Sequence, residues 1–194
     1  KTAYDAYDPE YTDSIVMNPK TGEIYAMAQY PSFDLNDPMK LTDLGKTNIS
    51  STWDKMTDKQ KNDLANKAWK NFAITDTFEP GSIYKPIVVA MALEEGVIKS
   101  TDSFYCGGVK KIADYEIHCH NRNGHGALSL TGVLAQSCNI GMMEIITKLG
   151  AEKYLQYQHD FGFGEKTGID LPNEASASNL LYSLSNLHSE IGRA

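Results

Sequence analysis

The sequence predicts an α+β fold in which helices pack on antiparallel strands. Three observations favour this class: a hairpin pattern over residues 14–30, a strongly apolar helix beginning near residue 82, and further helical patterns over residues 129–160. Apolar runs on either side of a turn sequence are typical of paired strands, and a period of 3.6 residues is typical of helices. The 194 residues fit one domain with its own hydrophobic core.

The first element is a predicted β-hairpin. Its strands are Ser-Ile-Val-Met at 14–17 and Glu-Ile-Tyr-Ala-Met at 23–27, and the turn signal Asn-Pro-Lys-Thr-Gly lies between them. A loop bracketed by Pro31 and Pro38 follows. A helix is expected from about Thr57, because residues 57–60 have the spacing of a capping box.

The second half of the chain is predicted to be mostly helical. One helix is expected from Ser82 to Glu95, with Gly96 as its stop, and its apolar residues cover most of its circumference. Such a helix is expected to be buried at the centre of the domain. Short strands or a hairpin are predicted over 103–120, and helices at about 129–136, 140–149 and 151–160.

Composition excludes some classes of partner. The formal net charge is −7 and no basic run occurs, so nucleic acid is not an expected partner. No apolar run approaches the roughly 20 residues that cross a bilayer, and no signal peptide opens the chain. Because the chain starts at Lys1 without Met, we expect it to be a piece of a longer protein.

Ser82 and Lys85 form the only Ser-x-x-Lys in the chain. Residues three apart on a helix share a face, so the Lys85 amine can reach the Ser82 hydroxyl. A lysine in a dry cleft loses its proton more readily and can activate a serine nucleophile. The alternative interpretation is an ordinary helix-capping serine with a solvated lysine one turn later.

The only Ser-x-Asn is formed by Ser137 and Asn139, with Cys138 between them. This triplet is expected in an extended loop between two helices, where Ser137 and Asn139 face a cleft and Cys138 faces the protein. A hydroxyl there can relay a proton, and an amide can hold the substrate backbone or the lysine. An ordinary loop that caps the helix from Ile140 is the alternative.

Taken in order, these segments resemble the transpeptidase domain of class B penicillin-binding proteins. The resemblance rests on the hairpin at 16–27, Phe-Glu-Pro-Gly-Ser-Ile-Tyr-Lys-Pro at 78–86, Gly-His-Gly at 124–126, the triplet at 137–139 and Thr-Gly-Ile-Asp-Leu-Pro at 167–172. It implies the serine β-lactamase and transpeptidase fold. Residues 1–194 would form a partial domain that holds the helical part and the opening strands, with the C-terminal strands absent.

By this resemblance, Ser82 is the acylated nucleophile and Lys85 is its base. Ser137 passes the proton to the departing D-alanine, and Asn139 positions the donor peptide. The implied reaction is peptidoglycan D,D-transpeptidation at the extracytoplasmic face of the bacterial membrane, which β-lactams inhibit. The implied partners are stem peptides, β-lactams and other cell-wall synthesis proteins. A serine β-lactamase and a non-catalytic, β-lactam-sensing or structural fragment remain alternatives.

Lys-Thr-Gly, the third motif of such enzymes, occurs at 20–22 and at 166–168. We reject both, because the first lies in a hairpin turn and the second in a helix-to-loop segment. In the family the working triplet lies on the sheet edge further downstream. A chain without it lacks one oxyanion donor, a loss of about 10²–10³ in rate, so the fragment alone is expected to be poorly active.

Thiols and imidazoles gather around the triplet in sequence. Cys106, Cys119, His120 and Cys138 are predicted to hold a structural zinc ion behind the nucleophile, although their spacing matches no standard zinc pattern. The alternatives are a Cys106–Cys119 disulfide and three buried free thiols. No cofactor is required for the acyl transfer itself. His125, between two glycines, is interpreted as structural.

Overall fold

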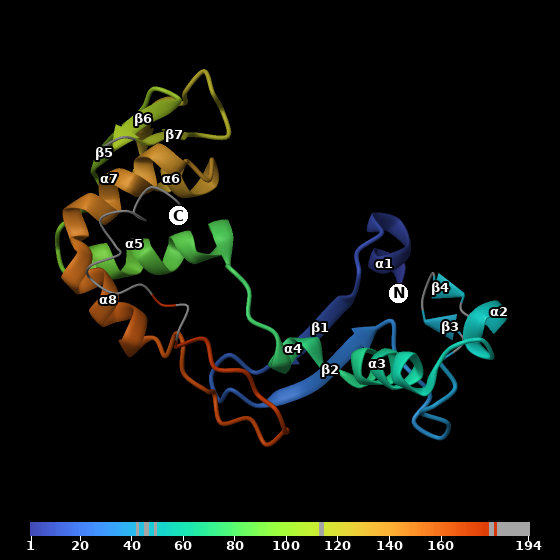
Figure 1. Cartoon of the computed structure of the whole chain (residues 1–194). Coiled ribbons are helices and arrows are strands. Elements are labelled where there is room, and N and C mark those ends of the chain that lie inside the picture. The colour runs from blue at the N-terminus through green and yellow to red at the C-terminus, as the bar shows by residue number, and fades with distance from the viewer. Residues whose placement is uncertain (42, 45–46, 49, 113–114, 179–180, 182–194) are drawn as a thin grey trace. The chain divides into compact units, whose positions relative to one another are not determined.

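The computed structural model describes residues 1–41, 43–44, 47–48, 50–112, 115–178 and 181 (Figure 1). The chain divides into two compact units. Unit 1 comprises Lys1–Asp76 and Leu171–Ala175, and unit 2 comprises Thr77–Asp170 and Ser176–Ala194. In each unit short helices accompany antiparallel strand pairs, which confirms the predicted α+β class.

Unit 1 begins with a helix and a hairpin. Its elements are α1 (Thr2–Tyr7), β1 (Thr12–Met17), β2 (Ile24–Tyr30), β3 (Asp43–Leu44), β4 (Thr47–Asn48), α2 (Ser50–Trp53), α3 (Asp58–Trp69) and α4 (Phe72–Thr75). β1 and β2 pair antiparallel, with Thr12 opposite Tyr30, so the predicted hairpin is confirmed. Gly22 closes its turn at a φ of +76°, which glycine adopts without strain. Several apolar side chains of the hairpin, including Val16 and Met17, remain exposed.

The capping box predicted at residue 57 is confirmed. The Thr57 hydroxyl accepts a hydrogen bond from the Gln60 N–H at 3.3 Å, and the Gln60 side chain accepts one from the Thr57 N–H at 2.9 Å. These bonds satisfy donors that a helix start leaves free. Ala65 of α3 and Leu41 are fully buried and form a small core. The partly buried residues that pack against them are Phe33, Trp53, Met56, Leu64 and Ala68.

Unit 2 contains a larger set of packed helices. Its elements are a 3₁₀ turn η1 (Gly81–Tyr84), α5 (Lys85–Glu94), β5 (Ser103–Cys106), β6 (Val109–Ile112), β7 (Tyr115–His118), β8 (Gly126–Ser129), α6 (Leu130–Ala135), α7 (Asn139–Leu149) and α8 (Ala151–Asp160). The three helical patterns predicted after residue 129 therefore correspond to α6, α7 and α8. α7 packs against α5, α8 and β5 (Figure 1). Its side chains supply much of the buried core.

The helix predicted from Ser82 starts differently. In an α-helix the N–H of residue 86 would donate to the Ser82 carbonyl, but Pro86 has no N–H. The Lys85 N–H donates to that carbonyl instead, which makes the first turn a 3₁₀ turn. The predicted end is confirmed, because Gly96 follows α5 at a φ of +66° and its N–H donates to the Leu93 carbonyl.

Burial all around α5 was also predicted, and this is wrong for one side. Val88, Met91 and Ala92 are buried, but Ile83 on the preceding turn is 71% exposed and Leu93 is 42% exposed. An apolar circumference alone does not show which side the rest of the unit covers.

The strands of unit 2 are only partly those predicted. β6 and β7 form the expected hairpin over the second half of 103–120. β5 pairs instead with β8, with Cys106 opposite Gly126. The sequence analysis did not predict β8, because this four-residue strand begins at a glycine and pairs with a partner some twenty residues earlier. No helix in the described residues is long and apolar enough to span a bilayer.

Candidate active site

Ser82 lies on the 3₁₀ turn that leads into α5, where its side chain is exposed. The turn is entered through Gly81 at a φ of +59°, a conformation that side chains disfavour. Ser82 lines an open pocket of about 400 Å³. The other residues that line it are His120, Ala135, Gln136, Ser137 and Asn139.

Lys85, the first residue of α5, is 9% exposed. Its Nζ donates to the Ser137 carbonyl at 2.8 Å, to Ser137 Oγ at 3.0 Å and to Asn139 Oδ1 at 2.6 Å. These bonds satisfy the three donors of an ammonium group. The hydrogen bonds described for this amine go to the Ser-x-Asn triplet and not to the Ser82 hydroxyl, which faces the same pocket.

Burial lowers the pKa of the Lys85 amine below its ordinary value, although the nearby Cys119 and Cys138 raise it. Desolvation has this effect because it penalises the charged ammonium more than the neutral amine. A lysine that loses its proton more easily is suited to act as a base beside a serine.

The triplet itself does not adopt the extended conformation that we predicted. Ser137 has a φ of +46°, Cys138 caps α7, and Asn139 is the first residue of that helix. The left-handed residue reverses the chain between α6 and α7. Even so, Ser137 and Asn139 both contact Lys85, and Cys138 is fully buried, so the predicted directions of the three side chains are confirmed.

The fit between α6 and α7 leaves little room behind the triplet. A Cβ on Gly141 would lie 2.7 Å from Val133 Cγ2, and the Gly141 N–H donates to Cys138 Sγ at 3.4 Å. Glycine at this position therefore lets α7 approach α6 and place the triplet over Lys85.

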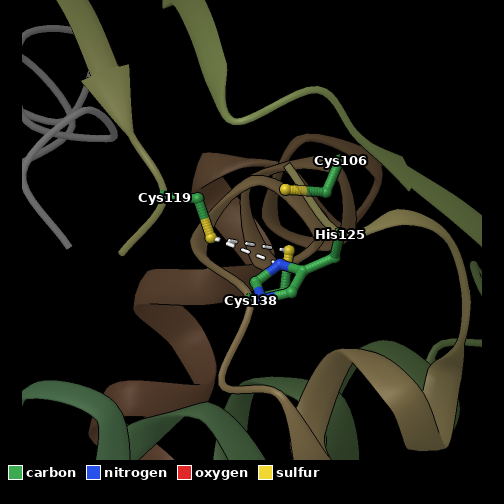
Figure 2. Close-up of side chains that lie close together, drawn as sticks. All are labelled: Cys106, Cys119, His125 and Cys138. Atoms are coloured by element: carbon green, nitrogen blue, oxygen red, sulfur yellow. Dashed lines mark hydrogen bonds between the residues drawn. The ribbon is translucent and has the colours of Figure 1, made fainter. Parts of the chain in front are cut away.

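Four possible metal ligands meet behind the triplet: Cys106, Cys119, His125 and Cys138 (Figure 2). Their sulfur and nitrogen atoms all lie within 4.8 Å of one another. The three cysteines are buried free thiols, so the alternative of a Cys106–Cys119 disulfide is not supported. Three thiols and one imidazole are a donor set that suits a tetrahedral zinc ion, so the cluster can hold a metal.

The histidine of this cluster is His125, and the prediction of His120 as the fourth ligand was wrong. The Nδ1 of His125 lies 3.6 Å from Cys119 Sγ, whereas His120 is exposed and lines the pocket. His125 reaches the cluster through a close backbone approach: a Cβ on Gly124 would lie 2.4 Å from the Cys106 carbonyl oxygen. The glycines that flank His125 were the sequence signal for this approach.

The thiols differ in acidity. Burial raises the pKa of Cys138 to about 12. Burial also acts on Cys119, but hydrogen bonds from the backbone of Asn139 and Asn121 and from the neighbouring thiols bring its pKa below the ordinary value. Of these two thiols, Cys119 is therefore the more acidic, and a bound cation would favour the thiolate form of its cysteine ligands.

Known proteins resemble this chain over most of its length. Residues 14–192 match the family model described as "Penicillin binding protein transpeptidase domain". Stage V sporulation protein D of Bacillus subtilis is 35% identical over 171 residues, which are 88% of this chain and 23% of that protein. Peptidoglycan D,D-transpeptidase FtsI of Escherichia coli is 30% identical over 188 residues, 95% of this chain and 26% of that protein.

The fold is also that of a solved structure. The crystal structure of Pseudomonas aeruginosa PBP2 in complex with WCK 5153 superposes with a TM-score of 0.71 at 22% identity. The superposition covers 99% of this chain and 44% of that one. The chain spans about a quarter of the length of the curated relatives described above.

Proposed function

Because this chain belongs to the penicillin-binding protein transpeptidase family, we propose that it is part of a peptidoglycan D,D-transpeptidase in which Ser82 is the nucleophile. The observation that carries the proposal is the position of Lys85, whose amine bonds Ser137 and Asn139 at the edge of the pocket that Ser82 lines. We assign residues 1–194 to one partial transpeptidase domain.

In the proposed acylation, Ser82 Oγ attacks the carbonyl carbon of the peptide bond between the two D-alanines. Neutral Lys85 takes the proton from the hydroxyl, and its lowered pKa supports this role. The bond to the terminal D-alanine breaks, and its nitrogen receives a proton through the Ser137 hydroxyl. The product is an ester on Ser82 and a free D-alanine. An amine of a neighbouring stem peptide then takes the acyl group and restores the hydroxyl.

The proton path rests on the contact of 3.0 Å between Lys85 Nζ and Ser137 Oγ. Catalytic hydrogen bonds are often long or misaligned before substrate binds. We therefore propose that substrate closes the remaining gap between Ser82 and this pair. Asn139 lines the pocket and holds the lysine through its Oδ1, at 2.6 Å, while its Nδ2 donates to the His118 carbonyl at 3.3 Å.

Labelling with a fluorescent penicillin tests the proposal on the full-length protein. The wild type is expected to retain the label through denaturing electrophoresis, because an ester bond holds it. Ser82→Ala is expected to abolish the label, while Ser100→Ala, an exposed serine of the same unit, keeps it. Undiminished labelling of Ser82→Ala would refute Ser82 as the nucleophile.

We also propose that Cys106, Cys119, His125 and Cys138 hold a structural zinc ion. The donor set and its 4.8 Å span support this. Because Cys138 lies between Ser137 and Asn139, a metal held there would brace the floor of the pocket without taking part in acyl transfer. Metal analysis of the purified protein is expected to find zinc, and His125→Ala to lose it. An absence of metal from wild-type protein purified without chelators would contradict the site.

The remaining proposals concern location and partners. We place the reaction at the extracytoplasmic face of the bacterial membrane, where stem peptides are cross-linked. The proposed ligands are these peptides and β-lactams, which mimic their D-alanyl-D-alanine end. Other cell-wall synthesis proteins are the proposed protein partners.

A further inference from the structure

His120 is a pocket residue that neither the acylation steps nor the cysteine cluster uses. It follows Cys119 directly, after the end of β7, and its side chain is exposed. It lines the same pocket as Ser82, Ser137 and Asn139. A ligand that is bound in this pocket at Ser82 can therefore reach this imidazole.

The contacts of the ring indicate which nitrogen is left to accept a hydrogen bond from a ligand. His120 Nδ1 lies 3.9 Å from Cys119 Sγ, and its ring stands 5.0 Å from that of His125 at an angle of 55°. In a neutral imidazole one nitrogen carries the proton and the other accepts. When Nδ1–H is directed at the sulfur, Nε2 is left as an acceptor on the far side of the ring.

We propose that His120 binds the substrate, and that its Nε2 accepts a hydrogen bond from an amide N–H of the stem peptide or of the acylamino group of a β-lactam. This inference rests on the proposed function, because it assigns a ligand group to the same pocket. The ligand chemistry fits, because a peptide presents amide donors along its length, and Gln136 is a further polar residue in the lining of the pocket.

Cys119 connects this contact to the cluster behind the pocket. Its sulfur lies close to the nitrogens of both His120 and His125, at 3.9 and 3.6 Å. Of the two, only His125 belongs to the metal-ligand set. The sulfur thereby orients the ring of His120, while the ring itself remains available to a ligand.

Two probes separate a ligand contact from a merely structural role. Second-order acylation rate constants are measured on the full-length protein with benzylpenicillin and with penicillanic acid, which lacks the acylamino group. His120→Ala is expected to slow acylation by benzylpenicillin about 3- to 10-fold, the effect of one neutral hydrogen bond, and to leave penicillanic acid unchanged. His120→Gln is expected to recover most of the rate, because its side-chain oxygen replaces the acceptor.

His159→Ala is the matched control, since this exposed histidine lies on α8 beside Glu165. Equal slowing with both probes, or slowing with neither, would overturn the inference. Loss of bound metal in His120→Ala would overturn it as well, because His120 would then be a ligand of the cluster. If neither probe acylates the wild type, the proposed function itself fails, and this inference fails with it.

Discussion

The two units of this chain differ in how their apolar side chains are covered. In unit 2 the side chains of α5, α6 and α7 join Phe104, Cys106 and Cys119 in one continuous buried core. Among the described residues of unit 1, the buried cluster behind α3 is built on Leu41 and Ala65, and the β1–β2 hairpin leaves Ile15, Val16 and Met17 exposed. The pocket is lined by residues of unit 2 alone.

This difference shows what the candidate site requires of its scaffold. Lys85, Ser137 and Asn139 come from two helix starts whose neighbours, Val88 and Cys138, are fully buried. A catalytic arrangement keeps its geometry only when packing fixes the supporting elements. We therefore expect substitutions in unit 2 to change the chemistry strongly, and comparable substitutions in unit 1 to change it little.

The largest contrast is expected for Lys85→Ala. Loss of a general base typically lowers the rate by about 10²–10⁴-fold, so penicillin acylation is expected to fall by that factor. Lys59→Ala, an exposed lysine on α3 of unit 1, is expected to acylate at the wild-type rate. Stopped-flow or quenched labelling gives both rate constants. A Lys85→Ala rate within a few-fold of wild type would remove the lysine from the mechanism.

A core substitution tests the packing itself. Ile145 on α7 is fully buried, and Ile145→Ala is expected to lower the free energy of unfolding by about 2–5 kcal/mol. Ile15→Ala on the exposed hairpin of unit 1 is expected to change it by less than about 0.5 kcal/mol. Urea unfolding followed by circular dichroism measures both. Similar losses for the two variants would show that the units do not differ in packing as described.

The rate of acylation is expected to rise with pH. In the proposed mechanism the neutral amine is the base, so the rate is expected to follow the fraction of Lys85 that has lost its proton and to rise about tenfold per pH unit below the pKa of this amine. Burial places that pKa below the ordinary value of lysine. A pH–rate profile for penicillin acylation measures the midpoint. A rate that falls with increasing pH across the neutral range would contradict a lysine base.

The smallest effect is expected at the start of α3. Thr57→Ala removes the capping box and is expected to cost about 1 kcal/mol of stability. Because the cap belongs to unit 1, the acylation rate is expected to stay at the wild-type value. Thermal unfolding and the labelling rate give the two quantities. A slowed acylation without loss of stability would contradict the expectation that a substitution in unit 1 leaves the acylation rate unchanged.

Local signals in the sequence were sufficient for much of the fold. The turn at 18–22, the cap at Thr57 and the stop at Gly96 act over a few residues, and the structure confirms all three. The sharp bend at Ser137 was not predictable in this way. A serine rarely adopts a positive φ, so the residue type at 137 gave no signal for the bend. The bend occurs where α6 and α7 approach each other closely at Gly141, which is a tertiary contact.

The cysteine cluster shows the same limit at longer range. Three of its four possible metal ligands were predicted from residue type, but His120 was chosen as the fourth because it adjoins Cys119 in sequence. His125 reaches the cluster because Gly124 contacts the backbone of Gly108 and Cys106. The flanking glycines signal a close backbone approach, but they do not identify these partners, which lie more than a dozen residues earlier in the chain. The late start of α5, by contrast, could have been predicted from Pro86. Because proline has no N–H, it cannot donate to the Ser82 carbonyl, and the Lys85 N–H does so in a 3₁₀ turn.

Peptide mapping by tandem mass spectrometry tests the central claim most directly. The full-length protein is treated with benzylpenicillin, digested and searched for the residue that carries the penicilloyl group. The group is predicted on Ser82 alone, at one per chain, and absent after mutation of Lys85 under the same exposure. A penicilloyl group on any other residue, or an unmodified Ser82 in protein that is fully labelled, would contradict the account.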